Sequence, residues 1–235
     1  MLLKLDRFTC SNTKINPNVP TFDMSTKIVI AIPAVILAAA AIAALMFQYR
    51  EPPPLEFDDI PGISIISPPV PLDPVELIDA NANAFSIDTL KNRWALVFFG
   101  FTHCPDICPT TLTSLKRSAQ HLRSQLPPEE EPAYVFISLD PARDTPEVVK
   151  DYVSYFDPAF IGLTGDEGAI DRLAETVGVI YDYEGDIAGG DYLVNHYAAI
   201  LVIDPQLRLR AHILPPHPMD KVTQAFTRIQ DYYGN

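Results

Sequence analysis

Two cysteines separated by three residues are the side chains of this sequence whose type and spacing most directly suggest chemistry. Cys104 and Cys108 lie in the segment FFGFTHCPDICPTT, in which an apolar run ends at Gly100 and a helical pattern begins near Cys108. On a helical turn, residues four apart share one face with their Cα atoms about 6 Å apart, which allows a disulfide or a shared soft cation. A helix N-terminus also lowers thiol pKa and favours the thiolate that both chemistries require.

The cysteine pair leaves two chemistries open, a redox-active dithiol and a pair of metal ligands. Structural zinc sites normally use four protein ligands, and the remaining cysteine, Cys10, lies apart in a segment without a fold signal. Thiolate-rich sites of low coordination number suit Cu(I) instead. A purely structural disulfide is disfavoured, because closing so short a loop contributes little stability.

Alternating strand and helix patterns surround the cysteines. Apolar runs predict strands at residues 75–79, 94–100, 133–139, 197–203 and 207–213. Periodicity and capping residues predict helices at residues 108–126, from Thr145 with Pro146 in the first turn, at residues 166–177 before Gly178, and from Pro218 to Tyr233. The predicted fold class is therefore α/β, and the cysteines fall on a strand-to-helix turn, where such domains place reactive groups.

Four segments are predicted along the chain. Residues 28–47 form a run of 20 without a charged side chain, long enough for a transmembrane anchor. Basic residues before this run predict that residues 1–27 are cytoplasmic and that the main domain lies on the other side of the membrane. Residues 48–74 are interpreted as a proline-rich linker, since eight prolines fall between positions 51 and 74, and residues 75–235 as the folded domain.

The overall charge argues against a nucleic-acid partner. The chain has 17 basic and 30 acidic residues and a net charge of −13. A surface this acidic repels phosphate backbones.

Three ordered blocks resemble the Sco/SenC family, thioredoxin-like proteins that help mature the copper centre of cytochrome c oxidase. The first block is FFGFTHCPDICPTTL, the second is FISLDPARDTPEVVKDYV followed by FIGLTGD, and the third is DYLVNHYAAILVIDPQ. The resemblance extends over residues 75–230. It implies a thioredoxin-like fold, with a central mixed sheet flanked by helices.

The same resemblance implies a copper site formed by Cys104, Cys108 and His196. Two thiolates and an imidazole would hold Cu(I), and the family also binds Cu(II). Family members often carry an acidic residue just before the histidine. Here that position is Asn195, and Asp191 is the candidate for a replacement carboxylate.

The function implied by the resemblance is that of a copper metallochaperone. Its partner would be the copper-accepting subunit of cytochrome c oxidase, with other copper chaperones or thiol reductants as further partners. The alternative is a thiol–disulfide oxidoreductase that reduces the cysteines of that subunit; a peroxidase is disfavoured because its proline and threonine pattern is missing. The expected location is the bacterial inner membrane with the domain facing the periplasm. The alternative is the mitochondrial inner membrane facing the intermembrane space.

Several further polar residues are candidates for the site. Asp140, Arg143 and Asp144 form a polar loop that the fold could bring near the cysteines, although turn formation is the favoured role. Other side chains are predicted to have no part in the site: His103 packs locally, His121 is exposed on a helix, and His212 and His217 are surface groups.

Overall fold

The structure is a computed structural model that describes residues 36–37, 39–40, 42 and 55–234. The chain divides into two units, Met1–Pro54 and Leu55–Asn235. The described residues of the first unit are helical. Most of the predicted anchor at 28–47, all of the segment 1–27 and the first part of the predicted linker lie outside the described residues. Within the described part of the chain, no helix is both long and apolar enough to cross a membrane.

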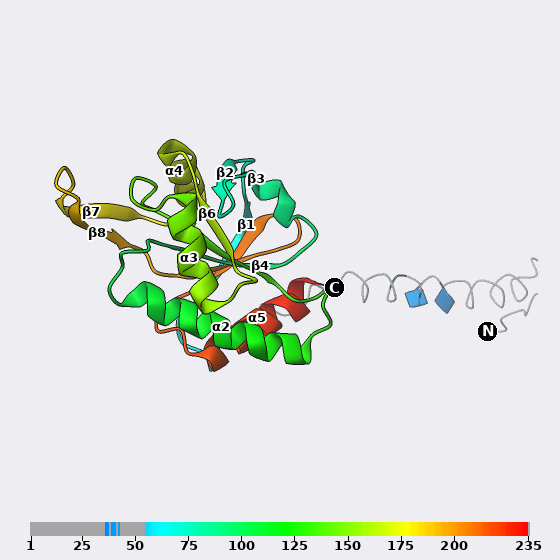
Figure 1. Cartoon of the computed structure of the whole chain (residues 1–235). Helices are drawn as coiled ribbons and strands as arrows, with labels where there is room; N and C mark the ends of the chain where they lie inside the picture. The colour runs from blue at the N-terminus through cyan, green and yellow to red at the C-terminus, as the bar shows by residue number, and fades with distance from the viewer. Residues whose placement is uncertain (1–35, 38, 41, 43–54, 235) are drawn as a thin grey trace, which may run out of the picture. The chain divides into compact units, whose positions relative to one another are not determined.

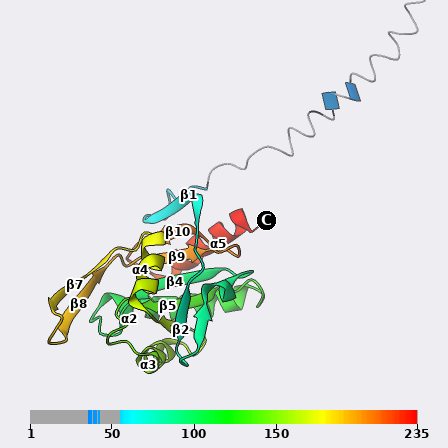
Figure 2. The same cartoon turned by 90° about the horizontal axis from the view of Figure 1, so that it is seen from above.

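An eight-stranded mixed sheet forms the centre of the second unit (Figures 1 and 2), in the order β1-β10-β9-β4-β5-β6-β2-β3. Its strands are β1 (Ile63–Pro71), β2 (Glu76–Asp79), β3 (Ala84–Ser86), β4 (Ala95–Gly100), β5 (Ala133–Ser138), β6 (Ile161–Thr164), β9 (Ile200–Ile203) and β10 (Arg208–Ile213). β5 pairs in parallel with β4 and β6, whereas β9 pairs with β4 in antiparallel fashion. This mixed sheet agrees with the predicted α/β class.

Four α-helices and one short 3-10 helix accompany the sheet. They are η1 (Ile87–Leu90), α2 (Ile107–Gln125), α3 (Pro146–Phe156), α4 (Glu167–Thr176) and α5 (Met219–Tyr233). The predicted starts of two helices are confirmed. The Thr145 side chain accepts a hydrogen bond from the Val148 amide at the start of α3, and Asp166 caps α4. α2 follows β4 and contacts both α3 and α5 (Figure 1), so the cysteine-bearing helix is supported on two sides.

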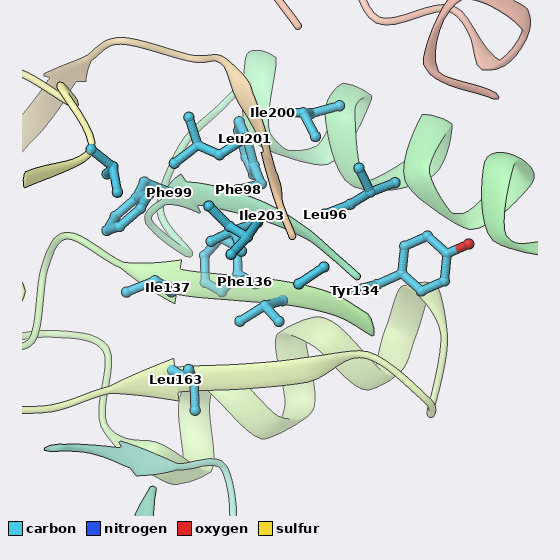
Figure 3. Packing of buried hydrophobic residues seen from close by; sticks show 14 of the residues in the cluster. Leu96, Phe98, Phe99, Tyr134, Phe136, Ile137, Leu163, Ile200, Leu201 and Ile203 are labelled. Atoms are coloured by element: carbon cyan, nitrogen blue, oxygen red, sulfur yellow. The ribbon is translucent and has the colours of Figure 1, made fainter. Parts of the chain in front are cut away.

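The core lies along the central strands. Every residue of β4, β5 and β9 is buried, as the unbroken apolar sequences of β4 and β9 predicted. Their side chains, with Leu163 of β6, pack across neighbouring strands (Figure 3). Each fully buried side chain of this size contributes about 1.5–3 kcal/mol relative to an exposed one. β4 is therefore firmly held up to Gly100, the point from which the cysteine loop begins.

The predicted linker boundary at residue 74 is too late. Ile63–Pro71 form β1, which pairs with β10 at the edge of the sheet. Prolines are tolerated in edge strands because one side of such a strand needs no ladder hydrogen bonds, and the pairing register shifts between Ile65 and Val70, around two of these prolines. The folded unit accordingly begins at Leu55.

A separate hairpin was not predicted. β7 (Tyr181–Asp186) and β8 (Asp191–His196) pair with each other in a two-stranded sheet of their own. The hairpin projects from the body of the domain in both Figure 1 and Figure 2. The sequence predicted that His196 precedes a strand at 197–203. Instead His196 is the last residue of β8, and β9 begins only at Ile200.

Candidate metal centre

The cysteine loop connects the end of β4 to the first turn of α2. Cys108 is buried in that first turn, Cys104 is half-buried, and both are free thiols. Asp106 occupies the N-cap position but makes no capping hydrogen bond with its side chain. The Cys104 sulfur takes that role and accepts from the Cys108 amide, 3.4 Å from its nitrogen.

Gly100 leaves the space that the Cys108 sulfur occupies. A Cβ atom at this position would lie 2.9 Å from the Cys108 Sγ and 3.0 Å from the ring of Phe136. Real Cβ atoms essentially never come that close to a neighbour. The glycine at the end of β4 therefore allows the sulfur to sit directly against the buried strand.

The two thiols have opposite acidities. Interaction with the Cys108 thiol, together with backbone amides of the α2 N-terminus, lowers the pKa of Cys104 to about 6 in spite of its partial burial. The same interaction, together with burial and the charge on Cys104, raises the pKa of Cys108. At neutral pH the pair consequently shares one proton.

His196 reaches the cysteines from the end of β8. Its Nε2 lies 3.7 Å from the Cys108 Sγ, and its ring makes edge contacts with Phe98 and Phe101 at centroid distances of 5.9 and 6.4 Å. Burial lowers the pKa of His196, so the imidazole is neutral at neutral pH. Neutral imidazole is the form that binds metal ions.

Cys104 and His196 line one surface cleft, and the buried Cys108 contacts both of them. The three ligand atoms do not all lie within 4.8 Å of one another; among the described residues only His103, Asp140 and Asp144 meet that condition. Because Cys108 and His196 are already close, the longer separation involves Cys104. Forming a three-coordinate site therefore requires the separation between the Cys104 sulfur and the His196 imidazole to shorten.

No carboxylate orients His196 in the described part of the chain. Its Nδ1 is buried without a hydrogen-bond partner there. Asp191, suggested as a replacement for an acid before the histidine, is exposed at the start of β8 and pairs with Asp186 instead. Asn195 donates to Glu184 across the hairpin, 2.8 Å away. The suggestion about Asp191 was therefore wrong.

The other histidines differ in part from their predicted roles. His212 and His217 were predicted to be surface groups, but both are buried. Ring nitrogens of His217 lie 3.1 Å from the Thr111 hydroxyl and 3.0 Å from the Ile213 carbonyl, which compensates its burial. His103, expected to pack, is exposed, whereas His121 is exposed on α2 as predicted.

The polar loop after β5 is more than a turn. Asp140 and Asp144 are fully buried, and Asp144 accepts a hydrogen bond from the Thr102 amide next to the cysteine loop. Tyr192, which sequence reasoning missed, donates to Asp140 from β8. The signal available in the sequence was an arginine between two acidic residues directly after a mostly apolar strand.

Comparisons with known proteins identify similar sequences and folds. The SCO1/SenC family model matches residues 72–231, which include both cysteines and His196. A protein of Stutzerimonas stutzeri is 43% identical over 159 residues, which are 67% of this chain and 76% of that protein.

Two solved structures with bound copper share the fold. Arabidopsis thaliana ScoI with copper bound is 32% identical with a TM-score of 0.62, over 68% of this chain and 99% of that one. Yeast Sco1 with copper bound is 29% identical with a TM-score of 0.64, over 70% of this chain and 91% of that one. Together with the family match and the cysteine–histidine cleft, these likenesses show that the chain belongs to the SCO1/SenC family.

Proposed function

We propose that this chain binds copper through Cys104, Cys108 and His196 and passes it to the copper-accepting subunit of cytochrome c oxidase. The observation that carries the proposal is the neutral imidazole of His196 beside the Cys108 sulfur, 3.7 Å away and 88 residues apart in sequence. Two thiolates and one imidazole form a soft donor set of low coordination number, which suits Cu(I). Cu(II) is a second state that the same ligands would accept.

The accessibility of the ligands supports transfer rather than permanent storage of the ion. Cys108 is fully buried, whereas Cys104 is half-buried at the rim of the cleft. Cys104 is thus the ligand that a donor or acceptor protein reaches first. Copper would leave by exchange of this sulfur for a ligand of the acceptor, while Cys108 and His196 still hold the ion.

The copper in two related structures supports the choice of metal. The resemblance to the Sco/SenC family, which implies maturation of the oxidase copper centre, supports the oxidase as target. The apolar run at residues 28–47 supports anchoring in a bacterial inner membrane with the domain in the periplasm. Other copper chaperones and thiol reductants would supply the ion and keep the cysteines reduced.

The test is anaerobic Cu(I) titration of residues 55–235 against a chromogenic chelator. Wild type is expected to bind one Cu(I), and His196→Ala to bind it more weakly while both thiols remain countable. His121→Ala, on the exposed face of α2, is the matched control. Equal affinity of His196→Ala and wild type would remove the histidine from the site. A wild-type protein without copper affinity would overturn the proposal.

A second function, thiol–disulfide exchange, is favoured by the low pKa and partial exposure of Cys104. The Cys104 thiolate would attack a disulfide of the acceptor subunit and release one of its sulfurs as a thiolate. Cys108 would then lose its proton and attack Cys104, which releases the second acceptor sulfur and leaves a Cys104–Cys108 disulfide. Two electrons pass to the acceptor. His196→Ala should retain this activity and Cys108→Ala should lose its completion.

A further inference from the structure

The loop between β5 and α3 contacts both halves of the proposed copper site. On one side, the buried Asp144 accepts three hydrogen bonds: from the Thr102 amide at 2.9 Å, from the Thr102 hydroxyl at 2.6 Å and from the Ser138 hydroxyl at 2.6 Å. Thr102 stands two residues before Cys104. A buried carboxylate with three donors is a firm anchor, so Asp144 fixes the start of the cysteine loop.

On its other side, the same loop contacts the hairpin through Arg143. Its Nε donates to Asp140 at 2.5 Å, and its Nη1 donates to the carbonyl oxygens of Gly190 and Tyr192 at 3.2 and 2.9 Å. The guanidinium lies 3.5 Å from the centre of the Tyr192 ring, and the Tyr192 hydroxyl donates to the other Asp140 oxygen at 2.7 Å. One guanidinium therefore joins a buried carboxylate, two hairpin carbonyls and an aromatic face.

The hairpin depends on such contacts for its placement. Among the described strands, β7 and β8 pair only with each other, and a two-stranded hairpin is marginally stable by itself. Most of its side chains are exposed, although Tyr192 and Val194 are buried. The Tyr183 hydroxyl adds a hydrogen bond to the Leu139 carbonyl, again in the loop after β5. β8 ends at His196, so the orientation of the hairpin sets the position of the imidazole.

We propose that Arg143, held by Asp140, is a positioning residue for the copper ligand His196. The loop at 139–145 then fixes the histidine-bearing hairpin and the cysteine-bearing loop relative to each other. This inference rests on the proposed copper function. A lysine could not replace the arginine, because only the planar guanidinium presents several donors in a rigid fork while stacking on a ring.

The approach of His103, Asp140 and Asp144 to within 4.8 Å of one another invites a different reading, a second metal site. Both carboxylates are already occupied by donors from protein groups, Asp140 by Arg143 and Tyr192, and Asp144 by Thr102 and Ser138. The hydrogen bonds account for the burial of both acids without an ion. We therefore interpret the cluster as a set of contacts that joins the loop after β5 to the cysteine loop and the hairpin, and not as a metal site.

A double-mutant cycle tests the positioning role. Arg143→Gln is expected to weaken Cu(I) binding by about tenfold, as loss of a supporting contact commonly does. In a His196→Ala background the same change should have no further effect, because Arg143 acts through the histidine. Arg172→Gln, exposed on α4, is the matched control and should bind copper like wild type.

Tyr192→Phe is a milder second variant that keeps the ring and removes only the hydroxyl bound to Asp140. It should weaken copper binding less than Arg143→Gln, and again only when His196 is present. Hydrogen exchange of the metal-free Arg143→Gln protein should speed up in β8 and leave β4 unchanged.

Three outcomes overturn the inference. They are unchanged affinity in Arg143→Gln while His196→Ala binds weakly, losses that add in the double variant, and exchange in β8 equal to that of wild type. The proposed function fails only if the wild-type protein has no copper affinity, whereas the three outcomes above refute the role of Arg143 in a protein that binds copper. The two failures are therefore distinguishable.

Discussion

The shared proton of the cysteine pair makes copper affinity depend on pH in two stages. At neutral pH the metal-free pair holds one proton, because the pKa of Cys104 is lowered to about 6 while that of Cys108 is raised. His196 adds no proton there, since burial lowers its pKa below the ordinary histidine value. In the proposed site, copper binding requires both sulfurs as thiolates. Above the pKa of Cys104, binding therefore releases one proton, and well below it binding releases two.

The number of protons released on binding determines how steeply the copper affinity changes with pH. Between pH 7 and 8 the affinity should change by about tenfold per pH unit, or about 1.4 kcal/mol. Between pH 5 and 6 the change should approach a hundredfold per unit, because Cys104 must now lose its proton as well. Affinity falls as pH falls in both ranges. Two independent thiols of ordinary pKa near 8.5 would instead give about a hundredfold per unit across the whole range below that value.

The assay is competition with a Cu(I) chelator of known protonation at half-unit steps from pH 5 to 8. Calorimetry in two buffers of different ionisation enthalpy counts the released protons independently. A change of about a hundredfold per unit between pH 7 and 8 would mean that Cys104 is not a thiolate in the free protein. No change over that range would mean that Cys108 has already lost its proton. Either result refutes the assignment of the shared proton.

Three further predictions concern single positions. Gly100→Ala should destabilise the domain by about 1–3 kcal/mol in urea unfolding and weaken copper binding, because its Cβ would meet the Cys108 sulfur at 2.9 Å. The control is Gly168→Ala inside α4, whose free energy of unfolding should stay within about 1 kcal/mol of the wild-type value. Alkylation of Cys104 should have a midpoint near pH 6, moved toward the ordinary thiol value in Cys108→Ala; an unchanged midpoint would contradict the proposed hydrogen bond between the thiols. Burial lowers the pKa of His217 to about 4. Between about pH 6.5 and 4 the unfolded chain therefore binds a proton at His217 that the folded chain does not bind. The free energy of unfolding should therefore decrease as the pH falls, by at most about 1.4 kcal/mol per pH unit. Equal pH dependence of this free energy in His217→Gln and wild type would contradict this.

The parts of the fold that sequence reasoning predicted well have local signals. β4 and β9 have unbroken apolar sequences and lie at the centre of the sheet. α3 begins where Thr145 and Pro146 predicted, since capping depends on residues within one turn. The cysteine turn was placed correctly for the same reason, because it lies between a clear strand and a clear helix.

The predictions that failed concern parts of the fold whose structure depends on residues distant in the sequence. β1 reads as a linker because of its prolines, and only its pairing with β10 at the sheet edge makes it a strand. β7 has no fully buried residue and β8 has only two, Tyr192 and Val194, so neither segment contains an apolar pattern long enough to indicate a strand. His217 reads as a surface residue until Thr111 and Ile213 provide partners for its ring.

The candidate site combines two cysteines that are close in sequence with a histidine from a distant hairpin. These two parts differ in how much they say about function. The cysteine pair, four residues apart, sets which sulfur is ionised, and that property serves copper binding and disulfide exchange equally well. A metal-specific donor enters only with His196, which arrives through a hairpin anchored by Arg143 and Asp140. Thiol chemistry could therefore be read from the segment around Cys104. The choice between carrying copper and carrying electrons depends instead on contacts across the fold, which is why variants of the hairpin and its anchor separate the two functions more sharply than variants of the cysteines.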